Sequence, residues 1–146
     1  MLEPLRVPPR LDALSTIGAY VLKAAEAGGI DQRAAYRLRL AVDEIATNII
    51  TYGRLGQQGE QVILVKAEID GESVSIVLED AGPAFNPLEH QQSADLNRPI
   101  DKRQIGGLGV FLAVRSVDDF QYDRAGGVNR NRLVVHRKPP DTAALR

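Results

Sequence analysis

The spacing of apolar residues changes once along this chain, and the change limits the folds open to it. Up to Gly53, apolar residues recur at three- and four-residue steps, which predicts amphipathic helices at about residues 11–27 and from an N-cap at Asp31 to Gly53. From Gln61 the period becomes two, the spacing of strands that bury one face. The chain is therefore expected to combine helices and strands.

Turn-forming residues divide the strand regions and predict their pairing. Leu2–Val7 is an expected edge strand, because the prolines that follow it cannot donate to a sheet ladder. Two antiparallel hairpins are expected, with turns at Asp70-Gly71 and Gly126-Gly127. Their strands are Val62–Ile69 with Ser73–Glu79, and Phe120–Arg124 with Leu133–Arg137.

Size and charge limit the functions that are available. With 146 residues and 44% hydrophobic content, the chain can bury one continuous core, so residues 1–138 are expected to form a single domain and residues 139–146 a frayed tail. The formal net charge is −1, from 18 Lys and Arg against 19 Asp and Glu. Proteins that bind nucleic acid through its phosphates normally carry a basic surplus. No nucleic-acid partner is expected.

Residue types that are missing remove several kinds of site. The chain has no Cys, which excludes disulfides, cysteine nucleophiles and iron–sulfur clusters and favours a reducing compartment, the cytoplasm. Its two histidines, His90 and His136, lack metal-site spacing, so any metal must be held by oxygen atoms. Apolar runs such as Val74–Leu78 are far shorter than the roughly 20 residues that span a membrane, and no membrane association is expected.

Three segments carry residue types suited to a phosphorylated ligand. Glu44 and Asn48 are four residues apart, so they project from the same helical face. Asp80 and Gly82 follow a hydrophobic strand, and Gly106-Gly107-Leu108-Gly109 precedes a short helical pattern. Taken singly, each segment has an ordinary alternative: a solvated helix surface, a plain turn and a flexible loop junction.

The glycine segment is the most informative of the three. Glycines just ahead of a helix, expected at Val110–Val117, let an anion approach outward-facing backbone N–H groups. The irregular residues 83–105 that lead into it are expected to form a loop of a length that usually has either a function or partial disorder. Phosphate is the anion expected to bind at this segment. Mg²⁺ keeps several waters and takes phosphate oxygens, so a single amide such as Asn48 is adequate protein ligation.

In this order and spacing, the segments resemble the N, G1 and G2 boxes of the gyrase, histidine kinase and MutL-type (GHKL) ATPase superfamily. They are most similar to its stand-alone members, the anti-sigma factor serine/threonine kinases of bacterial partner-switching systems. The resemblance covers about residues 11–138 and implies a two-layer α/β sandwich: a mixed, largely antiparallel sheet, helices on one face, and ATP between the helices and a lid. The matching stretches are LRLAVDEIATNIITYG (38–53), IVLEDAGPAFNP (76–87), RQIGGLGVFLAVRSVDDFQY (103–122) and GGVNRNRLVVHRK (126–138).

The resemblance implies a role for each residue of the first two boxes. Glu44 would be the catalytic general base toward an attacking hydroxyl or water. Asn48 would coordinate a Mg²⁺ that bridges the phosphates of ATP. Asp80 would accept a hydrogen bond from the adenine amino group, and Gly82 would let the base approach.

The third box would hold the phosphates. Gly106, Gly107 and Gly109, in the segment that contains Leu108, would wrap them. Arg103, just ahead of the glycines, would contact a phosphate or a partner, with a solvated surface position as the alternative.

Some positions depart from the family's pattern. Thr51 and Tyr52 stand where a phosphate-site histidine often follows the N-box asparagine. Asn129 and Asn131 stand in the closing strand, where many relatives place a threonine near the adenine, and Asn131 fits the stand-alone members better. Phe85 is the aromatic residue of the G1 box, and we expect it to pack in the core rather than against the nucleotide.

The activity implied by the resemblance is phosphoryl transfer to another protein. The leading hypothesis is an ATP-dependent serine/threonine protein kinase that phosphorylates an anti-sigma-factor antagonist and, in the alternate state, sequesters a sigma factor or another regulator. One alternative is a binding module that uses ATP without transferring phosphate, and another is an ATPase without a protein acceptor. The relatives also imply a possible homodimer, for which the first strand and first helix offer apolar surface.

Overall fold

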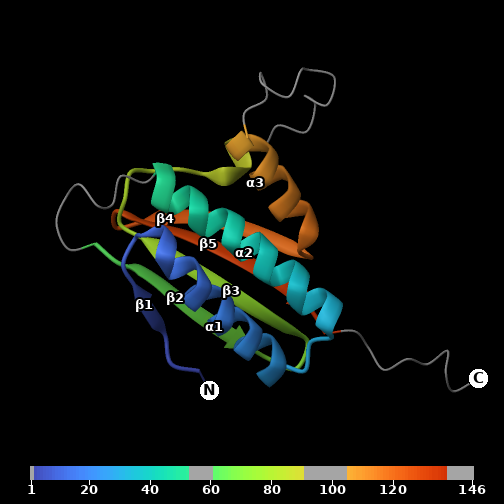
Figure 1. Cartoon of the computed structure of the whole chain (residues 1–146). Helices are drawn as coiled ribbons and strands as arrows, with labels where there is room; N and C mark the ends of the chain where they lie inside the picture. The colour runs from blue at the N-terminus through green and yellow to red at the C-terminus, as the bar shows by residue number, and fades with distance from the viewer. Residues whose placement is uncertain (1, 53–60, 91–104, 138–146) are drawn as a thin grey trace, which may run out of the picture.

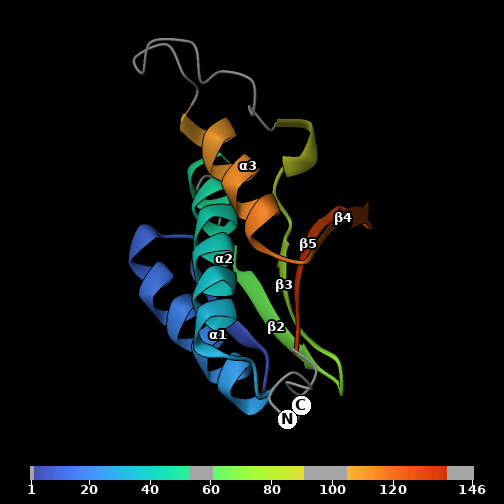
Figure 2. The same cartoon turned by 90° about the vertical axis from the view of Figure 1, so that its right-hand side faces the viewer.

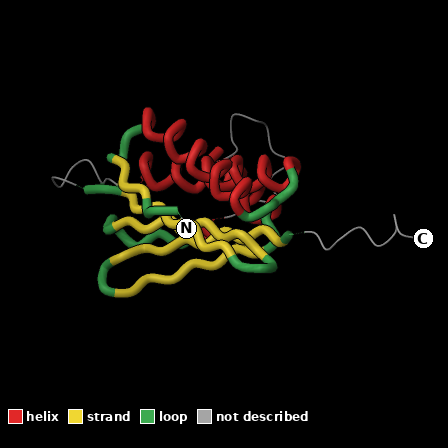
Figure 3. Tube along the Cα trace, turned by 90° about the horizontal axis from the view of Figure 1, so that it is seen from below, coloured by secondary structure: helices red, strands yellow, loops and turns green. Residues whose placement is uncertain are grey.

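Helices cover one face of a five-stranded sheet in this computed structural model, which describes residues 2–52, 61–90 and 105–137 (Figures 1 and 2). Figure 3 shows the helix layer above the strand layer. The helices are α1 (Leu14–Ala27), α2 (Gln32–Tyr52) and α3 (Ile105–Ser116), with 3-10 turns at Leu11–Ala13 and Pro87–His90. The strands are β1 (Leu5–Val7), β2 (Ile63–Ile69), β3 (Ser73–Asp80), β4 (Asp119–Ala125) and β5 (Val128–His136). The expected α/β sandwich is confirmed.

The strand order brings the end of β3 beside the start of β5. The order is β1-β2-β3-β5-β4, which places β1 at one edge as predicted. Every strand pair in the described ranges is antiparallel, including the two predicted hairpins, β2 with β3 and β4 with β5. In the β3–β5 pair, Asp80 lies opposite Asn129. This register sets the position of two polar side chains on which the candidate site depends.

The helices follow the predicted apolar stripes. Asp31 is the N-cap of α2, because its Oδ1 accepts a hydrogen bond from the Ala34 N–H at 2.8 Å. Leu38, Val42 and Ile45 of α2 have no exposed surface and form the centre of the core with the inner face of the sheet. The first helix begins one turn later than expected, because residues 11–13 form a 3-10 turn before α1.

The last hairpin is longer than the sequence pattern indicated. Its turn is made by Gly126 and Gly127, whose φ angles of 60° and 77° match the two-residue turn that joins strands of natural twist. β5 then pairs with β4 from Val128, not from Leu133 as expected. The expectation was wrong because residues 129–132 are polar, and the apolar alternation used to find the strand begins only after them.

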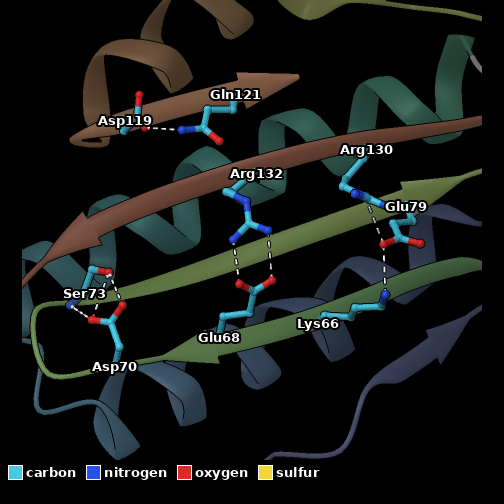
Figure 4. Close-up of polar contacts among 9 residues, drawn as sticks. All are labelled: Lys66, Glu68, Asp70, Ser73, Glu79, Asp119, Gln121, Arg130 and Arg132. Carbon is cyan, nitrogen blue, oxygen red and sulfur yellow. Dashed lines mark hydrogen bonds and ion pairs between the residues drawn. The ribbon is translucent and has the colours of Figure 1, made fainter. Parts of the chain in front are cut away.

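Charged side chains on the outer face of the sheet show which β5 residues point inward (Figure 4). Arg132 reaches across β3 to Glu68 on β2 with hydrogen bonds of 2.7 and 3.0 Å, and Arg130 makes an ion pair on the same face. Successive residues of a strand point to opposite faces. Asn129 and Asn131 therefore point toward the helices. The other inward-facing residues of the strand, Leu133 and Val135, are aliphatic.

Candidate functional site

Four buried polar side chains from three elements meet between α2 and the sheet. They are Asn48 of α2, Asp80 at the end of β3, and Asn129 and Asn131 of β5, with exposed fractions of 6%, 5%, 2% and 2%. All four line a small cavity of about 20 Å³, which is completed by Ile45, Ile49, Pro83, Phe85 and Pro87. A cavity of this size has room for about one water molecule. Asn48 and Asp80, which the family resemblance assigned to one nucleotide site, thus line the same cavity.

The carboxylate of Asp80 is held by one of its two oxygens. Its Oδ2 accepts hydrogen bonds from the Gly82 N–H at 3.0 Å and from Asn129 Nδ2 at 3.1 Å. Among the described residues, none donates a hydrogen bond to Oδ1. Burial raises the pKa of Asp80, and the hydrogen bonds from Asn129 and Gly82 and the charge of Arg124 partly offset the rise. The carboxylate thus has an oxygen left for a ligand at the cavity.

Asn131 adds a second acceptor to this cavity. Its Oδ1 is fully buried and accepts no hydrogen bond from the described part of the chain. A buried polar atom without a partner costs roughly 1–3 kcal/mol, so native structures rarely keep one without a reason. A donor group of a ligand, or a water in its absence, would remove that cost.

Asn129 makes the most hydrogen bonds of the four, and its role was not predicted. Its Nδ2 donates to Asp80, to the Gly82 carbonyl at 3.3 Å and to the Pro83 carbonyl at 2.9 Å. Its Oδ1 accepts from the Tyr122 hydroxyl, from Arg124 Nη1 at 2.9 Å and from the Phe85 N–H at 3.4 Å. The sequence does contain an indication of this position: Asn129 is an even number of residues before Leu133 and Val135, so it lies on the same inward face of the strand.

Phe85 is not where the sequence led us to expect it. Its side chain is half-buried at the wall of the cavity, outside the hydrophobic core cluster. The turn after β3 is fastened to β5 by Asn129, and this carries Phe85 toward the polar site. The expected core position is therefore wrong.

Glu44 lies one helical turn before Asn48, on the side of α2 that faces α3. The two helices pack together, and a methyl group added to Gly109 of α3 would overlap Oε2 of Glu44 and lie 3.1 Å from its carboxyl carbon. Glu44 remains exposed to solvent on its other side. Partial burial and then the neighbouring carboxylate of Asp43 raise the pKa of Glu44. A partly desolvated carboxylate at a surface is well suited to accept a proton from an arriving group.

The glycine segment lies inside α3 rather than ahead of it. We expected the helix to begin at Val110, but it begins at Ile105 and includes Gly106, Gly107 and Gly109. Glycine weakens a helix interior by about 1 kcal/mol relative to alanine, which is why the sequence favoured a later start. The first turn of a helix still has N–H groups without helical acceptors, and such groups can receive an anion. Arg103 and the side chain of Leu108 lie outside the described residues.

The described part of the chain offers no cluster of acidic side chains for a metal ion. Among the described residues, no group of three or more His, Cys, Asp or Glu is placed to bind one. The side-chain amide of Asn48 makes no hydrogen bond to any described residue, and it borders the cavity. Its oxygen is therefore a candidate metal ligand. This donor set fits Mg²⁺ that arrives with phosphate oxygens, because that ion keeps several waters. Within the same ranges, no helix is long and apolar enough to cross a membrane.

Comparison with known proteins identifies the family of the chain. The sequence profile of the histidine kinase-like ATPase domain matches residues 7–135. The chain is 24% identical over 144 residues to the serine-protein kinase RsbW of Listeria monocytogenes, covering 95% of this chain and 91% of that relative. It is 29% identical over 107 residues to the serine/threonine-protein kinase BtrW of Bordetella bronchiseptica, covering 73% and 74%.

A solved structure shows the same fold. The RsbU and RsbW domains of a Mycobacterium tuberculosis protein align with 94% of this chain at a TM-score of 0.56 and 16% sequence identity. This chain spans 34% of the length of that longer chain. At this identity, the likeness concerns the arrangement of helices and strands.

Proposed function

Because the chain belongs to the histidine kinase-like ATPase domain family, we propose that it is an ATP-dependent serine/threonine protein kinase of a partner-switching system. In this proposal it phosphorylates an anti-sigma-factor antagonist and binds a sigma factor or similar regulator in its other state. Distant relatives over most of the chain are named serine-protein kinases. Their identities of 24% and 29% support the family, while the substrate and the regulator are our inference.

One observation carries the proposal: an exposed carboxylate and a buried amide stand one turn apart on α2, above a buried acid at the end of β3. Glu44 and Asn48 are separated by about 6 Å of helix rise. Asn48 and Asp80 border the same cavity. A purine bound at Asp80 with its phosphates directed along α2 would therefore pass Asn48 and bring its last phosphate toward Glu44.

The adenine ring would be recognised by two hydrogen-bond acceptors of the protein. Asp80 Oδ1 would accept a hydrogen bond from the 6-amino group of adenine, and Asn131 Oδ1 would accept from a second donor or from a bridging water. Guanine carries a carbonyl oxygen at the same position, which an ionised carboxylate repels. These two acceptors thus favour ATP over GTP. Binding requires the walls of the present cavity, including Phe85, to move apart.

Asn48 would be the protein ligand of Mg²⁺. The bound ion would offset the charge that develops on the phosphates during transfer. We expect Asn48→Ala to weaken ATP binding in the presence of Mg²⁺ by about tenfold and to leave metal-free binding nearly unchanged. Titration calorimetry with and without the metal checks this. Equal weakening under both conditions would contradict a metal-ligand role.

Glu44 would act on the acceptor hydroxyl. Its carboxylate would take the proton of a serine or threonine side chain as the oxygen of that side chain forms a bond to the terminal phosphorus. The bond between that phosphorus and the leaving ADP oxygen breaks in the same step. The raised pKa of Glu44 makes it a stronger base than an ordinary glutamate.

Gly109 is expected to be essential for activity but not for stability. In Gly109→Ala, the new methyl group meets Glu44 Oε2 and must displace the carboxylate, so we expect the phosphotransfer rate to fall at least about tenfold. The free energy of unfolding should stay equal or rise by up to about 1 kcal/mol, because alanine favours helix. Urea denaturation and single-turnover transfer measure the two quantities. A parallel loss of both would show a packing defect instead.

The proposal is tested with radiolabelled ATP and a candidate antagonist protein. Label on a serine or threonine of the partner, lost in Glu44→Ala, is the expected result. Nucleotide-dependent complex formation without any labelled protein would favour a binding module. Release of inorganic phosphate by the chain alone, without a labelled acceptor, would favour a simple ATPase.

A further inference from the structure

We propose that Asn129 is the positioning residue that gives the site its purine specificity, by holding Asp80 and the turn after it against β5. The inference rests on the proposed function, since it concerns how the same pocket reads a base. It assigns no direct contact with the nucleotide to Asn129. Its effect is expected to act through Asp80.

The hydrogen bonds of Asn129 fix the orientation of its amide. Three donors from separate places surround Oδ1: the Tyr122 hydroxyl, Arg124 Nη1 and the Phe85 N–H. Three acceptors surround Nδ2: the Asp80 carboxylate and the carbonyls of residues 82 and 83. A flipped amide would set donor against donor at Arg124 and at the Phe85 N–H, and acceptor against acceptor at Asp80 and the two turn carbonyls; only the Tyr122 hydroxyl, which can also accept, would tolerate it. The amide can therefore take only the orientation that donates to Asp80.

This orientation decides which oxygen of Asp80 remains for a ligand. Asn129 Nδ2 and the Gly82 N–H both donate to Oδ2, which fixes the rotation of the carboxylate. Oδ1 is then the oxygen available to a ligand. The same amide ties residues 82, 83 and 85 to the sheet, and these follow Asp80 directly. Arg124 Nη1 adds a hydrogen bond to the Gly82 carbonyl at 2.9 Å. The Asp80 carboxylate, which would recognise the purine, is thus held in one position.

Specificity depends on that position more than overall binding does. A fixed, ionised acceptor attracts the 6-amino group of adenine and repels the 6-carbonyl of guanine. If Asp80 is released from β5, both effects weaken together, so ATP binds less tightly while GTP loses little or gains. A general loss of folding would instead lower the affinities for both nucleotides in proportion.

Two variants test the inference in the full chain. Asn129→Asp keeps the size of the side chain but places a carboxylate oxygen against Asp80 and the two turn carbonyls, so we expect the ratio of ATP to GTP affinity near neutral pH to fall at least about tenfold. Tyr122→Phe removes one donor to Oδ1 with little risk to folding. We expect it to lower the ratio by about two- to fivefold. Its folding is checked by circular dichroism.

A matched control lies on the same hairpin. Gln121→Glu is also an amide-to-acid change beside an aspartate, since Gln121 Nε2 donates to Asp119 Oδ2 at 2.7 Å, but its exposed side chain lies outside the Asn129 network (Figure 4). We expect it to keep the wild-type ratio.

Calorimetric titration with Mg·ATP and Mg·GTP separates the outcomes. If the wild-type chain prefers ATP and both network variants keep its ratio, the inference is overturned while the proposed function stands. If Asn129→Asp does not fold, Tyr122→Phe decides by itself. If the wild-type chain binds neither nucleotide, the proposed function and the inference fall together.

Discussion

Replacement of Glu44 by glutamine is expected to slow phosphotransfer by about 10²- to 10⁴-fold while leaving the affinity for ATP within about twofold of the wild type. The amide keeps the size of the side chain next to Gly109 but cannot take a proton from the acceptor hydroxyl. Single-turnover transfer from labelled ATP gives the rate, and calorimetry gives the affinity. Tight binding with normal transfer in Glu44→Gln would show that no base is needed at this position.

The pH dependence of the same reaction provides a second readout. The rate should fall on the acid side at a pH above the ordinary pKa of glutamate, because the pKa of Glu44 is raised by partial burial and by Asp43. Asp43→Asn is a matched variant that removes the neighbouring charge and keeps Glu44. It should move the acid limb to lower pH with little change in the maximal rate. An acid limb unaffected by either residue would assign it to another group.

Replacement of Asp80 by asparagine is expected to weaken ATP binding by about 10- to 100-fold without loss of stability. The change places an amide where an ionised acceptor was held by Gly82 and Asn129, and a hydrogen bond to a charged group is worth about 1.5–3 kcal/mol. Calorimetry with ATP and GTP measures the effect. Discrimination between the two nucleotides should also fall.

The stability of Asp80→Asn follows from the direction of the pKa shift. Burial raises the pKa of Asp80, so folding disfavours its ionised form. For such a group, stability is highest at low pH and falls as the pH rises from the unfolded-state pKa through the folded-state pKa. Near neutral pH the variant should therefore be as stable as the wild type or more so. The difference should shrink as the pH is lowered toward the unfolded-state pKa.

A nearby exposed aspartate provides the control for this prediction. Asp123→Asn, on the outer side of β4, removes a charge without touching the cavity and should leave ATP binding unchanged. Urea denaturation gives the free energies of unfolding of the two variants. A large loss of stability in Asp80→Asn would mean that the carboxylate is there for the fold rather than for a ligand.

Local patterns in the sequence predicted much of the fold. The helical stripes, the cap at Asp31 and the turn at Gly126-Gly127 depend on neighbours within a few residues. The spacing of Glu44 and Asn48 placed them on one face for the same reason, and Asp80 was expected at the end of a strand. These features are coded in single segments.

The remaining features depend on contacts between distant segments. Asn129 and Asp80 are separated by 49 residues, so no local pattern could show that one holds the other. The same network draws Phe85 out of the core, where its apolar character had placed it. The start of α3 was missed because packing against α2 overrides the weak helix propensity of its glycines.

Calorimetric titration of the full chain with Mg·ATP and Mg·GTP tests the central claim most directly, that Glu44, Asn48, Asp80 and the start of α3 surround one purine triphosphate. The account predicts saturable binding of about one ATP per chain, with GTP at least about tenfold weaker and the preference lost in Asp80→Asn. No saturable binding, or equal binding of ATP and GTP, would contradict it.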